Sequence, residues 1–299
     1  MKRFYIIMFT VSLIVFAASI VAIFSYGLNF DVDFTGGSVL EVEFTNGRPP
    51  IEDIVSVFES SKDPIVHATT VTPLGELGLV VRSSDKTNAT HGVVTSVLLK
   101  NWPEAGLQER QFDFIGPSVG EELKQKSITA IVILLIAVLL YIAFMFRALS
   151  RSLSLWAMSA GTVLGLAHDI IIPIGLFAVL GHFAGVQISA IYVAAILTIL
   201  GYTVSDKVVI YDRVRENILR GSSKAPLADL VHTSVMQTLV RSINNTLVVV
   251  ISSLAVFLFG GESIKYFALA LMVGIALGAY SSIFVASPIL VWMGKGKRT

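Results

Sequence analysis

The sequence has 299 residues, of which 54% are hydrophobic and 14% are charged, and its mean hydropathy is +0.77. A soluble domain carries about 25% charged residues, so this composition excludes an ordinary soluble protein and indicates a chain that crosses a membrane several times. The net charge of +1 gives no reason to expect a nucleic-acid partner.

Six apolar runs are long enough to span a bilayer, because a helix needs about 20 residues to cross about 30 Å of hydrocarbon. They lie at about 4–26, 128–146, 153–180, 188–211, 243–259 and 267–292. The first run follows Lys2 and Arg3, but its apolar core is longer than that of a signal peptide and no small-x-small cleavage site follows. We therefore interpret it as a retained anchor and predict a polytopic α-helical membrane protein with six transmembrane helices.

The positions of lysine and arginine predict the orientation, since these residues gather on the cytoplasmic side. They lie at the amino terminus, after the second run, after the fourth run and in the tail: Lys2, Arg3, Arg147, Arg151, Arg213, Arg215, Arg220, Lys224, Arg241, Lys295, Lys297 and Arg298. We expect both termini in the cytoplasm. The segment between the first two runs then lies outside. Neither this segment nor the rest of the chain contains a cysteine.

Only this outer segment, 27–126, has patterns of a water-soluble unit. Strands are predicted at 38–44, 65–71, 77–83 and 107–116, and helices at 51–60 and near 87–102. The order β-α-β-β-α-β predicts a small α+β ferredoxin-like extracytoplasmic domain. It lies between the first transmembrane helix, 1–26, and a five-helix transmembrane bundle with a cytoplasmic tail, 127–299. His67 and His91 have no further ligand at metal spacing, so we interpret them as solvated or packed side chains.

Polar residues recur at helical spacing inside two of the runs. The fourth run carries Thr198, Tyr202, Ser205 and Asp206 at i, i+4, i+7 and i+8, and the fifth carries Gln237, Arg241, Asn244, Asn245 and Ser252. Polar stripes on neighbouring helices are expected to face one another and not lipid. Asp206 and Arg241 would both lie in the cytoplasmic half, where an ion pair or a water-bridged contact is geometrically possible.

A charged residue in a membrane span is a functional hypothesis by default, because a charge at mid-bilayer costs a few kcal/mol. Arg241 has an alternative interpretation as a snorkelling, topology-setting residue, whereas the short side chain of Asp206 snorkels poorly. His168 and Asp169 are adjacent in the third run and point about 100° apart, so they either pack the bundle or line a water path. Lys207 is expected to point off the stripe and reach the interface.

Two further patterns have structural interpretations. The segment YDRVREN at 211–217 begins where the fourth helix leaves the bilayer, and we interpret it as a solvated helix end. The glycine pairs Gly161/Gly165 and Gly274/Gly278 have i, i+4 spacing, which lets helices approach closely.

Five segments in order resemble the SecD/SecF family of protein translocase accessory subunits. They are DFTGG at 33–37, IGPSVGEEL at 115–123, HD at 168–169, GYTVSDKVVIYDRVREN at 201–217 and FGGESIKYFALALMVGIALGAYSSIFVASP at 259–288. The resemblance covers nearly the whole chain, and DFTGG with IGPSVGEEL is closer to the SecF branch. Ser205 stands where the family often has Asn, and Lys207 where a small hydroxyl residue is frequent.

The resemblance implies a subunit without covalent catalysis that uses the proton motive force to assist late steps of Sec-dependent translocation across the bacterial inner membrane. The implied partners are SecD, the SecYEG translocon with SecA and YajC, unfolded secreted polypeptides and membrane lipid. No cofactor is expected beyond the coupling ion, H⁺ or Na⁺. Asp206 matches the family's proton-carrying carboxylate and Arg241 the basic residue facing it. The predicted relay comprises Asp206, Arg241, Asp169, His168, Tyr202, Ser205 and Asn245.

Rival function classes make different predictions. An exporter of small solutes or lipids of the resistance-nodulation-division type shares the intramembrane carboxylate, but the outer segment is small for a substrate pocket. A membrane-embedded protease would need a motif such as HExxH or GxGD, and the sequence has neither. A purely structural scaffold subunit would tolerate replacement of Asp206 by asparagine.

Overall fold

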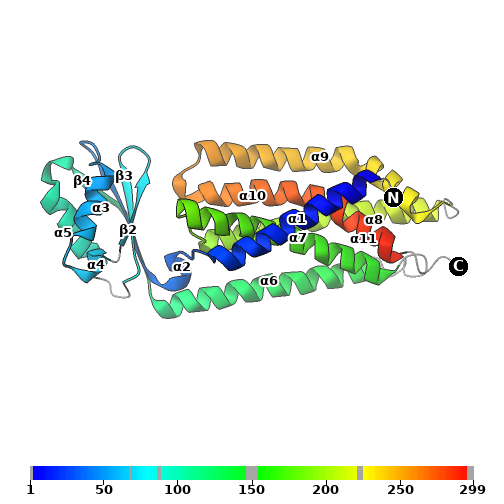
Figure 1. The fold of residues 1–299 in the computed structure, drawn as a ribbon, viewed down its shortest axis with the longest axis horizontal. Helices are drawn as coiled ribbons and strands as arrows, with labels where there is room; N and C mark the ends of the chain where they lie inside the picture. Colours follow the sequence, from blue (N-terminus) through cyan, green and yellow to red (C-terminus); the bar gives the residue numbers. More distant parts are fainter. Residues whose placement is uncertain (1–2, 68, 86–88, 146–153, 221–224, 295–299) are drawn as a thin grey trace. The chain divides into compact units, whose positions relative to one another are not determined.

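A computed structural model describes residues 3–67, 69–85, 89–145, 154–220 and 225–294. The chain forms two compact units. One unit contains 1–29, 129–186 and 191–299, and the other contains 30–128 together with 187–190. Figure 1 shows the long helices of the first unit and the small sheet of the second.

The described residues contain six helices that are long and apolar enough to span a membrane, as predicted. They are α1 (Arg3–Tyr26), α6 (Pro117–Met145), α7 (Leu155–Ala184), α8 (Ala190–Leu219), α9 (Leu227–Phe259) and a last helix that runs through α10 (Glu262–Ser281), a π-helical turn (Ser282–Ala286) and α11 (Ser287–Gly294). The fifth helix begins well before the predicted 243. Its first turns bury Leu227, Leu230, Val231 and Val235 at helical spacing, so they continue the helix.

Glycines mark the closest approaches within the bundle. A Cβ at Gly175 of α7 would lie 2.5 Å from the Ser19 Cβ of α1, so these two helices cross there. A Cβ at Gly274 or Gly278 of α10 would lie 2.3 Å or 2.1 Å from side-chain atoms of α8. The close-packing interpretation of the Gly274/Gly278 pair is therefore confirmed.

The second unit, called the outer unit after its predicted side of the membrane, has a four-stranded antiparallel sheet with strand order β2-β3-β1-β4. The strands are β1 (Gly37–Phe44), β2 (Thr69–Leu74), β3 (Gly78–Ser83) and β4 (Leu107–Ile115), and the helices α3 (Ile51–Glu59) and α5 (Thr90–Asn101) complete the β-α-β-β-α-β order. One face of the sheet packs on these helices through a core of Leu40, Val42, Phe44, Ile54, Phe58, Val66, Leu79, Val81, Val94 and Leu98. This is the predicted ferredoxin-like topology.

The strand predicted at 65–71 is wrong in its first half. Pro64–His67 forms a single helical turn, α4, and the strand begins at Thr69. The Asp63 carboxylate accepts a hydrogen bond from the backbone N–H of Ile65 at 2.9 Å, and Pro64 occupies the first helical position that proline favours. Local capping therefore outweighs the β-branched composition of the segment.

The DFTGG segment is held by backbone contacts that only glycine allows. Gly36 and Gly37 have φ of 74° and 140°, and a Cβ at Gly37 would lie 2.2 Å from the Ser83 carbonyl oxygen. The Asp33 carboxylate accepts a hydrogen bond from the backbone N–H of Ala190 at 2.7 Å. The pattern is thus a packing requirement of the outer unit.

Candidate functional site

A buried ion pair links α7 to α8. The Lys207 Nζ lies 2.6 Å from the Asp169 Oδ2, and both side chains are 0% exposed. Lysine and aspartate are almost never fully buried unless they are paired, so each charge requires the other. The expectation that Lys207 reaches the membrane interface is wrong.

The reason is the shape of α7 opposite Lys207. A Cβ at Gly165 would lie 2.5 Å from the Lys207 Cε, so the missing side chain makes the space for the lysine stem. One turn earlier, a Cβ at Gly161 would lie 2.6 Å from the Tyr211 hydroxyl. This glycine pair therefore receives two side chains of α8, a more specific role than general helix packing.

His168 shares the same carboxylate. Its Nδ1 lies 3.2 Å from the Asp169 Oδ1, so the two adjacent residues are in direct contact despite pointing along different directions of the helix. The imidazole ring stacks between Phe16 of α1 and Tyr280 of α10, with centroid distances of 6.5 Å and 6.1 Å. The contact fixes the position of Asp169 from a second side.

Asp206 is the second buried carboxylate of the bundle, with 7% exposure. Ser242 of α9 lies beside it, yet neither the Asp206 Oδ2 nor the Ser242 Oγ has a hydrogen-bond partner among the described residues. The electrostatic fields of Lys207, Asp169 and Arg241 reach this carboxylate. Asp206 is therefore a buried acid with a free oxygen, close to charged groups that do not neutralise it directly.

The direct Asp206–Arg241 ion pair is not formed within the part of the chain that the structure describes. Arg241 is exposed and lines a cavity of about 510 Å³ with Met145, Val208, Val209, Asp212, Arg213, Arg215, Glu216, Gln237 and Thr238. Ser242, the next residue of α9, occupies the inward position instead.

Most side chains of the two predicted polar stripes do not face each other. Tyr202 is half-buried, and its side chain is within the field of Asp206. Ser205 of α8 and Asn245 of α9 are exposed, as are the other members of the α9 stripe, Gln237, Arg241, Asn244 and Ser252. The structure thus brings Asp169, His168, Lys207 and Asp206 together, and it leaves Ser205 and Asn245 on the outside of the bundle.

A different set of residues on α9 faces inward. Small hydroxyl side chains are buried at Ser234, Thr238, Ser242, Thr246 and Ser253. The first four have strict i, i+4 spacing, a signal that the sequence itself carries, although the larger amides and Arg241 on the same helix are more conspicuous. These hydroxyls line the interior with groups that both donate and accept hydrogen bonds.

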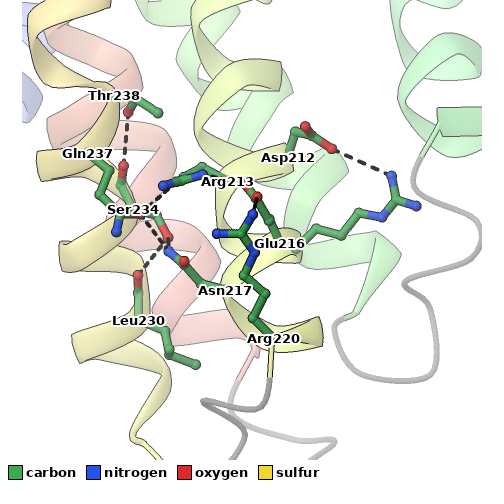
Figure 2. Close-up of polar contacts among 10 residues, drawn as sticks. Asp212, Arg213, Glu216, Asn217, Arg220, Leu230, Ser234, Gln237 and Thr238 are labelled. Atoms are coloured by element: carbon green, nitrogen blue, oxygen red, sulfur yellow. Dashed lines mark hydrogen bonds and ion pairs between the residues drawn. The ribbon is translucent and has the colours of Figure 1, made fainter.

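The YDRVREN segment forms a polar network at the end of α8, shown in Figure 2. The Arg213 Nε donates a hydrogen bond to the Gln237 Oε1 at 2.7 Å, and the Asn217 Nδ2 donates to the Gln237 Oε1 and the Ser234 Oγ at 3.0 Å and 2.8 Å. Glu216 forms ion pairs with Arg213 and Arg220. The segment therefore ties α8 to α9, which goes beyond a solvated helix end.

No group of three or more His, Cys, Asp or Glu side chains that could hold a metal ion occurs in the described ranges.

Two family models match the chain. The model described as "Protein export membrane protein SecD/SecF, C-terminal" covers residues 95–296, and the model "SecD/SecF GG Motif" covers residues 21–47. The chain belongs to the SecD/SecF family. The resemblance of the five motifs is confirmed, and the chain has a Sec-associated role in protein translocation.

Relatives cover most of the chain. The protein translocase subunit SecF of Thermobaculum terrenum is 34% identical, with 96% of this chain and 92% of the relative covered. SecF of Haemophilus influenzae is 35% identical, with 96% and 83% covered. The translocase subunit SecDF of Brucella abortus is 36% identical, but the chain spans only 35% of its length.

A solved structure shares the fold. The crystal structure of SecDF from Thermus thermophilus, described as a translocon-associated membrane protein, matches with a TM-score of 0.82 and 29% identity. The match covers 96% of this chain and 37% of that one. The SecD/SecF chain described here therefore corresponds to about a third of that protein.

Proposed function

We propose that this chain is the SecF-like half of a SecD–SecF complex of the bacterial inner membrane. The complex uses the proton motive force to assist late steps of Sec-dependent translocation. A SecD subunit supplies the other half, and the pair works beside SecYEG, SecA and YajC on unfolded secreted polypeptides. Both termini are cytoplasmic and the ferredoxin-like unit is periplasmic. The match of this chain to about a third of the length of the SecDF structure supports a larger partner subunit that corresponds to the rest.

Asp206 carries the proposal. It lies within a spanning helix, is buried, and has one carboxylate oxygen without a hydrogen-bond partner in the described part of the chain. A carboxyl group in such a place changes its charge when a proton arrives, and a neighbouring cation changes how tightly the proton is held. Moving one proton through a membrane potential supplies about 2.3 kcal/mol per 100 mV.

The exposed polar side chains support the proposal of a partner subunit. Tyr202 and Ser205 of α8, with Arg241 and Asn245 of α9, lie on or near the outside of helices whose other exposed side chains are mostly apolar. Polar side chains in a membrane face protein or water in preference to lipid. We assign this stripe to the junction with SecD, where Arg241 and water complete the path to Asp206.

The test is export of a secreted reporter in cells whose only copy carries Asp206→Asn. Export is expected to be lost while membrane level and partner assembly, followed by immunoblot, stay normal. Asp212→Asn is the matched control, because Asp212 is an exposed carboxylate on the same helix. Normal export by Asp206→Asn would refute the proton role and favour a scaffold subunit.

A further inference from the structure

A positive charge already occupies the interior of the site, in contact with two oxygen atoms. The Lys207 Nζ lies 2.6 Å from the Asp169 Oδ2 and 3.4 Å from the Thr203 carbonyl oxygen. The Thr203 hydroxyl is buried one helical turn away, without a hydrogen-bond partner in the described ranges. Ser281 of α10, whose buried hydroxyl donates a hydrogen bond to the Gly278 carbonyl oxygen at 3.1 Å, lies near the same carboxylate. These are the ligand types that a small cation such as Na⁺ uses, and the ammonium group fills the position.

Both oxygens of Asp169 are already engaged. Lys207 contacts the Oδ2, and the His168 ring contacts the Oδ1. The glycine at 165 leaves room for the Lys207 stem, since a Cβ there would lie 2.5 Å from its Cε. The pocket is therefore shaped for this side chain and holds it against one carboxylate.

We propose that Lys207 is a built-in cation that neutralises Asp169 permanently, so that the bundle couples to protons through Asp206 and does not bind Na⁺. The inference rests on the proposed role of Asp206. It adds the choice of ion, which the sequence leaves open.

The physical reason is the difference between the two ions. A proton needs one free carboxylate oxygen, and the Asp206 Oδ2 is free of protein partners in the described part of the chain. A sodium ion needs several oxygen ligands around it. The other carboxylate whose field reaches Asp206 is Asp169, which is committed to Lys207. Lys207 from α8 and Arg241 from α9 also both repel a second cation, while Tyr202 and Ser242 add only neutral hydroxyls.

The first experiment measures the thermal unfolding midpoint of the purified complex with its partner subunit, in NaCl and in KCl at equal ionic strength and pH. The unaltered complex is expected to show the same midpoint in both salts. Lys207→Ser opens the oxygen-lined position and should gain a rise of the midpoint specific to Na⁺. Adding Asp169→Asn should abolish that rise. A Na⁺-specific rise in the unaltered complex, or none in assembled Lys207→Ser, overturns the proposal.

A second variant covers the case in which Lys207→Ser does not assemble. The double substitution Lys207→Met with Asp169→Asn replaces the pair by neutral side chains of similar size. It should assemble and, without the Asp169 carboxylate, show the same unfolding midpoint in NaCl and in KCl. A Na⁺-specific rise of the midpoint in the assembled double variant would overturn the proposal, because Na⁺ would then bind without Asp169. Asp206→Asn tests the proton role separately, so the two failures are distinguishable.

Discussion

Replacing Gly165 by alanine tests whether the space beside Lys207 maintains the buried ion pair. The new Cβ would lie 2.5 Å from the Lys207 Cε and 3.5 Å from its Nζ. The end of a lysine usually moves aside easily, but here the ammonium is held at 2.6 Å by Asp169. Overpacking alone costs about 1–3 kcal/mol, and losing one partner of a buried pair costs about 3–5 kcal/mol. We expect a loss of about 2–4 kcal/mol, between these limits.

The assay is unfolding of the purified complex, compared with Gly201→Ala as the control. Gly201 lies in the α8 helix with no atom within 4 Å of its would-be Cβ, so alanine there should stabilise by about 0.5–1 kcal/mol through helix propensity. Combining Gly165→Ala with Lys207→Met should be less harmful than the sum of the two, because both disturb one contact. A Gly165→Ala variant as stable as Gly201→Ala would refute the reasoning.

Three other predictions concern separate parts of the chain. Gly37→Ala should destabilise the outer unit by at least about 2 kcal/mol, measured by protease resistance, because it combines a φ of 140° with overlap on a backbone oxygen. Ser242→Ala should slow export about threefold to tenfold, the worth of one hydrogen bond that this buried hydroxyl forms with the neighbouring Asp206 carboxylate when the acid changes charge, whereas exposed Ser252→Ala should leave the rate unchanged. Burial raises the pKa of Asp31, and the Arg82 guanidinium opposes the rise. In Arg82→Met the Asp31 carboxylate ionises without that cation, so the free energy of unfolding of the outer unit should fall below that of the unaltered protein by about 1 kcal/mol as pH increases from about 4 to about 7, and by little at low pH. Unfolding measured at both pH values checks this.

The spans and the outer sandwich were predictable because their signals are local. Apolar length identifies a spanning helix, and alternation in SVLEVEF identifies β1, whatever the rest of the chain does. The errors lie where capping residues or polar side chains oppose the prediction from apolar composition. Asp63 and Pro64 start a helical turn inside an apolar, β-branched stretch, and the buried first turns of α9 are too polar to count as membrane.

The facing of the helices was not predictable in the same way. In a soluble helix the polar face points to water, but a membrane helix is apolar on most sides, so a polar stripe can face the interior, a partner or a cavity. The stripe of Ser205 and Asn245 lies outside, and the small hydroxyls around Ser242 lie inside. Lys207 was assigned to the interface because long cations usually snorkel, and its partner is 38 residues away in the sequence.

The buried position of Lys207 changes the number of charged groups in the site that can exchange a proton. With Lys207 at the interface, Asp169 and Asp206 would be two buried acids competing for protons, and each would raise the cost of ionising the other. With Lys207 held against Asp169, that pair is neutral and a single carboxylate remains to change charge. One proton through 100 mV supplies about 2.3 kcal/mol, which biases a two-state equilibrium by tens of fold. That is enough to favour one arrangement of helices over another, but too little to pull a folded protein apart in one step, since domains are stable by about 5–15 kcal/mol. Under the proposed function, a site with one exchangeable charge suits a subunit that biases the motion of an already unfolded polypeptide over repeated cycles.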